Sequence, residues 1–200
     1  MIKSRLQWWP KTSDLFPSSQ ASFRPGRSCA DNLTMLTMSV KEAFSMGKDV
    51  LACFLVKGAF DNVNSDILMK KFSTMECPHN IVNLVNFLTH ERNVTFVVND
   101  SYIFIRKVFK GLSQGGVLSP LLYLIYVNDI IVSLNPFIQI SQFANDIAIY
   151  CPVTIPSKSK RTLEKTITIL GANFDHLGLS LALEKTILIH FNQKEIRPVA

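Results

Sequence analysis

Apolar residues recur along the chain at two different spacings, and each spacing predicts a different kind of element. A spacing of three and four residues predicts helices over residues 28–46, 65–75, 79–90, 118–134 and 157–177. Short runs of apolar, β-branched and aromatic residues predict strands over residues 50–56, 93–99, 102–109, 137–143, 147–153 and 186–191. The first strand has no polar alternation, which is typical of a buried strand.

Local signals set the ends of these elements. Ser28 and Asp31 are candidate caps at the start of the first helix, and Gly47 follows its end. Pro78 separates the next two helices. The polar triplet Asn99-Asp100-Ser101 joins residues 93–99 and 102–109 into a predicted hairpin.

With that hairpin set aside, the order is strand, helices, strand–turn–strand, helix, strand. This is the split βαβ order of a ferredoxin-like fold. It predicts an α+β protein with an antiparallel sheet and helices on one face, which leaves the other face free for a ligand. Polymerases and small RNA-binding modules both use this layout, so the fold alone does not choose between them.

Composition narrows the class. The chain has 200 residues, of which 48% are hydrophobic and 18% charged, so it forms a packed globular body rather than a disordered tail. Its 21 Lys and Arg outnumber its 15 Asp and Glu, which gives a net charge of +6. A basic balance favours partners rich in phosphate, either nucleic acid or an anionic membrane surface.

Cysteines and hydropathy indicate the compartment. The four cysteines form no C-x-x-C pair and have no nearby histidines at metal-ligand spacing, so we expect reduced, mostly buried thiols. The N-terminus has no apolar core typical of a signal peptide. The most apolar stretch, residues 117–127, is shorter than the ~18 residues that a membrane span needs. The sequence therefore predicts an intracellular protein of the cytoplasm or nucleus, not secreted and without a membrane partner.

Five motifs occur in series. They are Gln20-Ala-Ser-Phe-Arg-Pro-Gly-Arg-Ser28, Phe54-Leu-Val-Lys-Gly-Ala-Phe-Asp-Asn-Val63, Gly111-Leu-Ser-Gln-Gly-Gly-Val-Leu-Ser-Pro-Leu-Leu122, Phe143-Ala-Asn-Asp146 and Gly178-Leu-Ser-Leu-Ala-Leu-Glu-Lys-Thr186. Together, and in this order, they resemble the motifs of the reverse transcriptase domain of non-long-terminal-repeat (LINE-type) retrotransposons. One motif alone is suggestive, and five in series are highly specific.

The resemblance implies a polymerase palm. Residues 1–47 correspond to a partial fingers segment and residues 48–200 to the palm, with no thumb. The implied activity is RNA-directed DNA polymerisation, in which a deoxynucleoside triphosphate is joined to a primer 3′-OH opposite an RNA template. The implied partners are the RNA template, the DNA primer and the deoxynucleoside triphosphates. The implied cofactor is Mg²⁺, or Mn²⁺, held as a pair of ions by carboxylates.

Two metal-binding positions depart from the family pattern. Asn145 stands where the first Asp of the hairpin pair belongs, and Asp146 keeps the second. Counting back from Ala59, Leu55 occupies the position of the family's first metal-binding Asp. Either one codon has been lost between Leu55 and Val56 or the Asp has been replaced, and the flanking match favours the loss, which would shift the register of the strand. Because both principal carboxylates are missing, we expect a catalytically impaired site.

Other family positions are retained. Phe60 matches a steric gate beneath the sugar, and Gln114 with Gly115 matches the loop near the incoming nucleotide. Arg24 and Arg27 match positions that face the triphosphate, and Lys185 matches a Lys that protonates pyrophosphate. Each has a simpler alternative: a core Phe, an ordinary Gly-rich loop or a solvated surface cation.

Two more carboxylates lie near the implied site: Asp61 in the second motif, and Asp129 in Ile125-Tyr-Val-Asn-Asp-Ile130, which the resemblance joins to the third motif. We expect Asp61 to cap the segment that follows it and Asp129 to make a local hydrogen bond or salt bridge. The alternative function is a non-catalytic nucleic-acid-binding module with a palm-like sheet. In that case Phe143 and Tyr150 are the aromatic residues available for base stacking.

Overall fold

The computed structural model describes residues 3, 4, 6, 9, 15–56, 60–99, 101–192 and 196–198. The chain forms two compact units. The first comprises Met1–Phe16 and Ala59–Val127, and the second comprises Pro17–Gly58 and Asn128–Ala200. The predicted boundary after residue 47 separates functional parts of the family, and this division into packed units does not test it.

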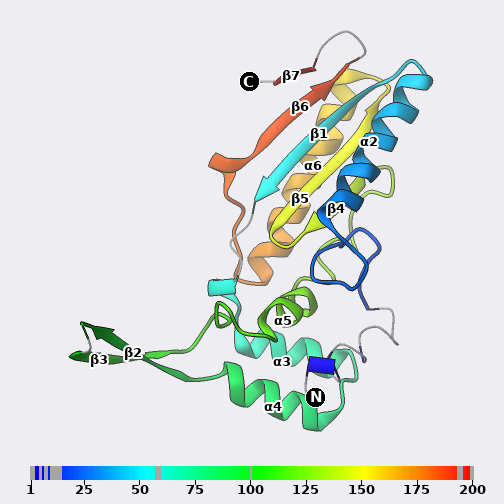
Figure 1. Cartoon of the computed structure of the whole chain (residues 1–200). Helices are drawn as coiled ribbons and strands as arrows, with labels where there is room; N and C mark the ends of the chain where they lie inside the picture. The colour runs from blue at the N-terminus through cyan, green and yellow to red at the C-terminus, as the bar shows by residue number, and fades with distance from the viewer. Residues whose placement is uncertain are drawn as a thin grey trace. The chain divides into compact units, whose positions relative to one another are not determined.

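The second unit is an antiparallel sheet with two long helices (Figure 1). Its strands are β1 (Asp49–Val56), β4 (Gln139–Phe143), β5 (Asp146–Val153), β6 (Ile187–Phe191) and β7 (Ile196–Pro198), in the order β4-β5-β1-β6-β7. Its helices are α2 (Cys29–Ser45) and α6 (Pro156–His176), with the short 3₁₀ turn η2 (Leu183–Lys185) before β6. The predicted α+β class and antiparallel sheet are confirmed, and β7 was not predicted.

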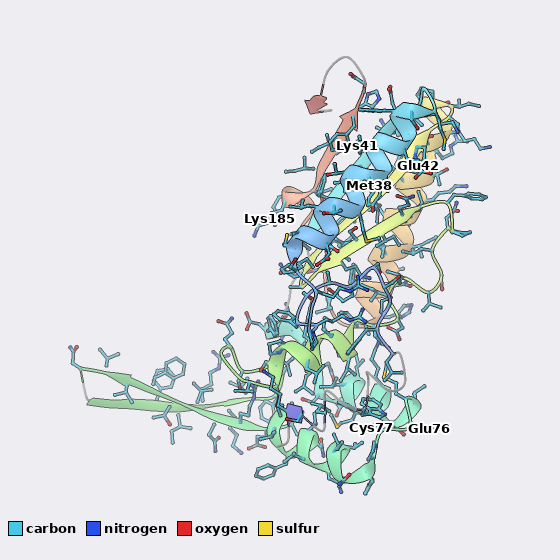
Figure 2. The ribbon with its side chains drawn as sticks, turned by 45° about the vertical axis from the view of Figure 1, so that its right-hand side comes forward. Met38, Lys41, Glu42, Glu76, Cys77 and Lys185 are labelled. Carbon is cyan, nitrogen blue, oxygen red and sulfur yellow. The ribbon has the colours of Figure 1, made fainter. Side chains whose placement is uncertain are left out.

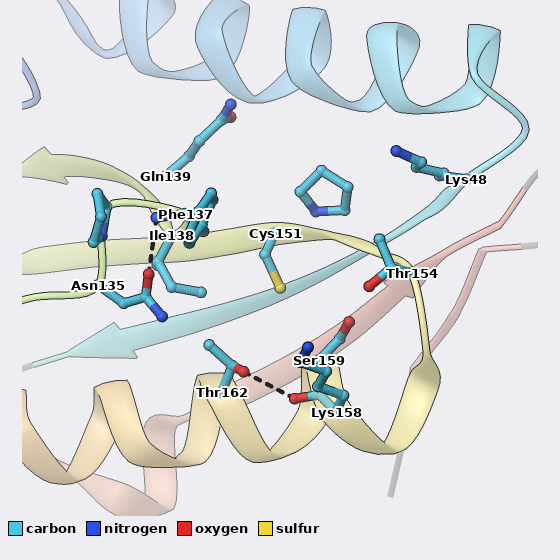
Figure 3. A pocket seen from close by; sticks show the side chains of 12 residues that line it. Lys48, Asn135, Phe137, Ile138, Gln139, Cys151, Thr154, Lys158, Ser159 and Thr162 are labelled. Atoms are coloured by element: carbon cyan, nitrogen blue, oxygen red, sulfur yellow. Dashed lines mark hydrogen bonds between the residues drawn. The ribbon is translucent and has the colours of Figure 1, made fainter.

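Helices cover both faces of this sheet, so the predicted single covered face is wrong. On one face Leu36, Val40 and Ala43 of α2 pack against Val50, Ala52 and Tyr150. On the other, Ser159 and Thr162 of α6 line a cavity with Cys151 of β5. Figure 3 shows the sheet between the two helices. The physical reason lies in β1, whose residues are buried at both parities, so both of its faces need an apolar cover.

Helix α2 is amphipathic, which explains its position. Its apolar stripe faces the sheet, whereas Met38, Lys41 and Glu42, labelled in Figure 2, are exposed. At its N-terminus the predicted capping residues form a capping box, in which the Asp31 carboxylate accepts hydrogen bonds from the Ser28 amide (2.5 Å) and hydroxyl (3.0 Å).

The first unit contains a helical cluster and a hairpin. Its elements are η1 (Phe60–Asn62), α3 (Ser65–Thr74), α4 (His79–Thr89), β2 (Arg92–Val98), β3 (Ser101–Val108) and α5 (Ser119–Tyr126). All eight residues of α5 except Pro120 are buried, and Phe72 of α3 stacks on Trp9 with ring centroids 5.7 Å apart. Helix α5 ends eight residues before the predicted end at residue 134, because Asn128 and Asp129 follow it and favour turns.

The cap of α3 is Asn64, not Asp61 as predicted. The Asn64 side-chain carbonyl accepts hydrogen bonds from the amides of Asp66 (2.8 Å) and Ile67 (3.2 Å). An N-cap must directly precede the first helical residue, and Asp61 lies within the separate turn η1. Across the part of the chain that the structure describes, no helix is long and apolar enough to cross a membrane.

The packing of α2 on the sheet gives a test of the covered face. Replacing Ala52, which is fully buried beside Ala43 and Tyr150, with Leu should lower the free energy of unfolding by about 1–3 kcal/mol, because the added methylenes have no free volume. Urea unfolding followed by circular dichroism measures the change. The exposed change Met38→Leu on the same helix should alter it by less than about 0.5 kcal/mol. Equal stability of Ala52→Leu and the parent chain would contradict this packing.

The capping box gives a pH-dependent prediction. The hydrogen bonds from the Ser28 amide and then from its hydroxyl hold the pKa of Asp31 below its ordinary value of 3.8. A lowered pKa means that the carboxylate stabilises the fold above about pH 3.8, and that this contribution is lost as the pH falls further. Ser28→Ala removes the hydroxyl but keeps the amide, so the pKa of Asp31 should rise only part of the way to 3.8. An NMR titration of the Asp31 carboxyl carbon measures both values, and an unchanged pKa in Ser28→Ala would count against the hydroxyl bond.

Candidate active site

The hairpin between β4 and β5 presents one carboxylate. Phe143 and Asp146 are paired across it, so Ala144 and Asn145 form a two-residue turn. Ala144 has φ of 53°, the left-handed region that such turns require at a central position and that a Cβ disfavours. Asp146 is exposed and Asn145 is half-buried. The turn therefore offers a single charged ligand, beside a neutral amide, at the end of the sheet.

The adjacent strand β1 does not bring Leu55 to this carboxylate. In the β1–β5 register, Val56 pairs with Asp146 and Leu55 pairs with Ile147. Directly paired residues project to the same face of a sheet, and neighbours along a strand project to opposite faces. Leu55 is 1% exposed and belongs to the face that carries the buried Ile147. Asp146 directly precedes Ile147 on β5, so the Asp146 side chain projects to the face opposite that of Leu55.

These residues do not fit a pair of divalent ions. Mg²⁺ takes hard oxygen ligands, and a two-metal site requires carboxylates that bridge or flank both ions. Among the described residues no group of three or more His, Cys, Asp or Glu could hold a metal ion. At the hairpin the donors are one carboxylate and one uncharged amide, with a leucine in place of the third.

The predicted cations of the second unit have different environments. The Arg24 guanidinium donates hydrogen bonds to the carbonyls of Pro17 (3.0 Å) and Gln20 (3.1 Å), so it closes the turn that contains the Gln20 motif. Arg27 is exposed. Lys185, labelled in Figure 2, lies exposed on η2. Arg24 thus stabilises its own loop by hydrogen bonds, and Arg27 and Lys185 present their charges to solvent.

In the first unit, the Gly-rich loop packs against η1. The Gln114 amide donates to both carboxylate oxygens of Asp61 (3.2 and 3.4 Å). The Leu112 amide donates to the Phe60 carbonyl (2.8 Å), and the Phe60 ring lies 4.9 Å from that of Tyr123. The structure therefore brings Phe60 and Gln114 together, although in sequence they lie far apart.

Two glycines make this arrangement possible. A Cβ on Gly111 would lie 2.8 Å from the backbone oxygen of Asp61, so only glycine allows the loop to approach η1 so closely. Gly115 has φ of +80°, which a side chain would strain. The role of Gly115 beside a nucleotide remains a prediction. The positive φ of its backbone is by itself a reason for glycine at this position.

Arg92 is a residue that sequence reasoning missed. Its guanidinium donates to the Ser113 hydroxyl (2.9 Å) and to the carbonyls of Lys110 (2.8 Å) and Gly111 (2.6 Å). These bonds fix the loop from the start of β2. The contacts span about twenty residues, and no local pattern marks an arginine that bonds to distant carbonyls.

The aromatic residues of the alternative function are poorly placed for stacking. Tyr150 is 1% exposed, packs under α2, and its hydroxyl lies 3.3 Å from that of Ser141. Phe143 is half-buried at the end of β4. Base stacking needs an open ring face, so Tyr150 cannot provide a platform.

Other reactive groups lie away from the hairpin. A cavity of about 650 Å³, seen in Figure 3, is lined by Lys48, Cys151 and Ser159. Cys151 is five residues from Asp146, or about 17 Å along β5. All four cysteines are free, and burial raises the pKa of Cys53 and of Cys77 to about 11. Neither thiol is therefore a nucleophile at neutral pH.

Comparison with known proteins identifies the family. The model of the family described as reverse transcriptase (RNA-dependent DNA polymerase) matches residues 1–197. A probable RNA-directed DNA polymerase from transposon BS of Drosophila melanogaster is 27% identical over 207 aligned positions, which cover 100% of this chain and 23% of that protein. The chain thus spans about a quarter of the length of this curated relative.

Solved structures share the fold. A telomerase of Candida albicans, solved with a fragment of telomeric RNA, is 15% identical with a TM-score of 0.68, over 98% of this chain and 34% of that one. A telomerase of Candida tropicalis is 11% identical with a TM-score of 0.70, over 97% of this chain and 34% of that one. The predicted resemblance to the reverse transcriptase domain of a retrotransposon is confirmed by the family match, which spans nearly the whole chain, together with the similarity to the transposon BS protein. This chain belongs to the reverse transcriptase (RNA-dependent DNA polymerase) family.

Proposed function

We propose that this chain is the palm and part of the fingers of a retrotransposon RNA-directed DNA polymerase whose metal site is impaired. In the ancestral reaction a primer 3′-OH attacks a deoxynucleoside triphosphate opposite an RNA template, with Mg²⁺ or Mn²⁺ as cofactor. The observation that carries the impairment is the donor set at the β4–β5 turn. It offers Asp146 and the uncharged Asn145, and the strand beside it presents Leu55 to the core.

The strand register favours loss of an Asp over its replacement. Leu55 sits in a buried apolar position opposite Ile147, where an Asp would be costly. An Asp inserted after Leu55 would take the register position now held by Val56, which is paired with Asp146. Paired residues share a face, so only the insertion sets two carboxylates side by side.

The retained residues support the same ancestry. Phe60 lies beside Tyr123, and the Gln114 amide is held by Asp61. We assign Phe60 to the sugar of the nucleotide and Gln114 with Gly115 to the loop next to it. Arg27 and Lys185 present exposed charges for phosphate, whereas Arg24 bonds to its own loop.

Primer extension tests the impairment. A repaired chain, with Asp inserted between Leu55 and Val56 and with Asn145→Asp, should extend a DNA primer on an RNA template with Mg²⁺ or Mn²⁺. We expect it to exceed the parent chain by more than about 10²-fold, the scale on which one transition-state-stabilising group acts. Equal extension by the parent and repaired chains would show that the parent site is competent.

A matched variant separates loss from replacement. Leu55→Asp combined with Asn145→Asp adds the same charges, but it places one carboxylate on the buried face. It should lose stability in urea by about 3 kcal/mol or more and should not extend primers. If Leu55→Asp works and the insertion does not, the Asp was replaced and the register argument is wrong. If both chains fold by circular dichroism and neither extends primers, these residues do not form a polymerase site on their own.

A further inference from the structure

The hairpin of β2 and β3 carries an exposed aromatic pair. Figure 1 shows these strands as a ribbon that extends beyond α3, α4 and α5 of the same unit. Phe96 and Phe104 face each other across the ladder with ring centroids 4.5 Å apart and planes at 20°. They are 40% and 47% exposed. An isolated two-stranded hairpin is marginally stable in water, so leaving this apolar face uncovered is costly.

Cations flank the pair on the same face. Val94 pairs with Arg106, and Phe96 pairs with Phe104, so strand alternation places Arg106 beside the two rings. Lys110 follows β3. Both side chains are exposed, and neither has a hydrogen-bond or ion-pair partner among the described residues. Lys107, on the opposite face of the hairpin, is instead paired with Glu91 at 2.7 Å.

Phe96 and the flanking cations line one cleft, and Phe104 supports the Phe96 ring from outside the lining. Its volume is about 850 Å³, and its walls include Phe96, Arg106 and Lys110 together with Gln114. Two of its lining cations, Arg106 and Lys110, have no ion-pair partner among the described residues, whereas Lys107 is paired with Glu91. The one lining carboxylate, Asp61, accepts hydrogen bonds from Gln114. Arg92 fixes the loop that forms one side of the cleft through its hydrogen bonds to the Ser113 hydroxyl and the Gly111 carbonyl. The cleft is therefore basic, preformed and apolar along one wall.

We infer that this cleft binds a single-stranded polynucleotide, with a base stacked on the Phe96 ring, which Phe104 supports, and phosphates at Arg106 and Lys110. The inference rests on the proposed function in one respect, the polynucleotide nature of the partner. Base–aromatic stacking beside a basic track is the usual means of holding single strands without sequence readout. An apolar protein surface would fit the rings but would bury two unpaired cations, which is unfavourable. A single strand satisfies the rings and the cations at once.

Fluorescence anisotropy of a labelled uridine oligonucleotide of about 12 nucleotides, titrated with the full chain, tests the cleft. Phe96→Leu keeps the apolar volume but removes the ring, and should weaken binding about 5- to 150-fold. Arg106→Gln and Lys110→Gln should each lower the slope of log K against log salt by about 0.7. A blunt duplex of the same length should compete poorly, because its bases are not free to stack.

Two control variants match these changes outside the cleft. Phe87→Leu removes a ring that is 82% exposed on α4, and Lys70→Gln removes an exposed cation on α3. Neither should change affinity by more than about 2-fold or alter the salt slope by the 0.7 expected for a lost contact. If they weaken binding as much as the cleft variants do, the chain binds through its general charge and the cleft is not a site.

The outcomes separate this inference from the proposed function. Salt-dependent binding that is unaffected by Phe96→Leu, Arg106→Gln and Lys110→Gln overturns the cleft and leaves the polymerase ancestry intact. Absence of binding by a folded chain also overturns the cleft, while primer extension by the repaired chain still reports on the polymerase. Phe96→Leu that changes sedimentation but not anisotropy would assign the face to self-association and overturn the inference.

Discussion

The pairing of β1 with β5 is the constraint on which the rest of the second unit depends. Eight consecutive pairs run without a bulge from Asp49–Val153 to Val56–Asp146. Because side chains alternate, this one register decides which residues face α2, which face α6 and which adjoin the β4–β5 turn. Val50 and Ala52 pack under α2, whereas Leu51, Cys53 and Leu55 are buried on the other face. A slip of one residue would exchange these two sets.

That register also bears on the proposed loss of a residue after Leu55. We expected a deletion after Leu55 to shift the strand and misplace the side chains upstream. The structure shows the upstream alternation intact, with both apolar sets buried. Burial of five apolar residues, each worth about 1.5–3 kcal/mol for a full-sized side chain, outweighs any preference of the residues that follow. The register of β1 as far as Leu55 is therefore set by the burial of its apolar residues.

Much of this arrangement could be predicted from the sequence, and the exceptions have physical causes. The helices around Ala43 and Leu163 and the turn at Asn145 follow from periodicity and turn chemistry, which are local. The second covered face was also visible in principle, because residues 50–56 lack the alternation of a half-exposed strand. Asn64 as the cap of α3 was missed because Asp61 appeared within a family motif, although Asn64 directly precedes the helix.

Long-range polar contacts are what the sequence could not provide. Arg92 bonds to carbonyls and a hydroxyl about twenty residues away, and the cleft it supports exists only once the hairpin has folded back on the loop.

The two candidate sites also differ in how well they tolerate the displacement of one residue. A divalent-metal site fails when one carboxylate moves by a residue, since ligand geometry is fixed to fractions of an ångström. Stacking and phosphate contacts are distributed over several side chains and need no such precision. A copy of this domain that loses its metal ligands can therefore keep a surface for single strands, because the two properties depend on different residues and on different physical demands.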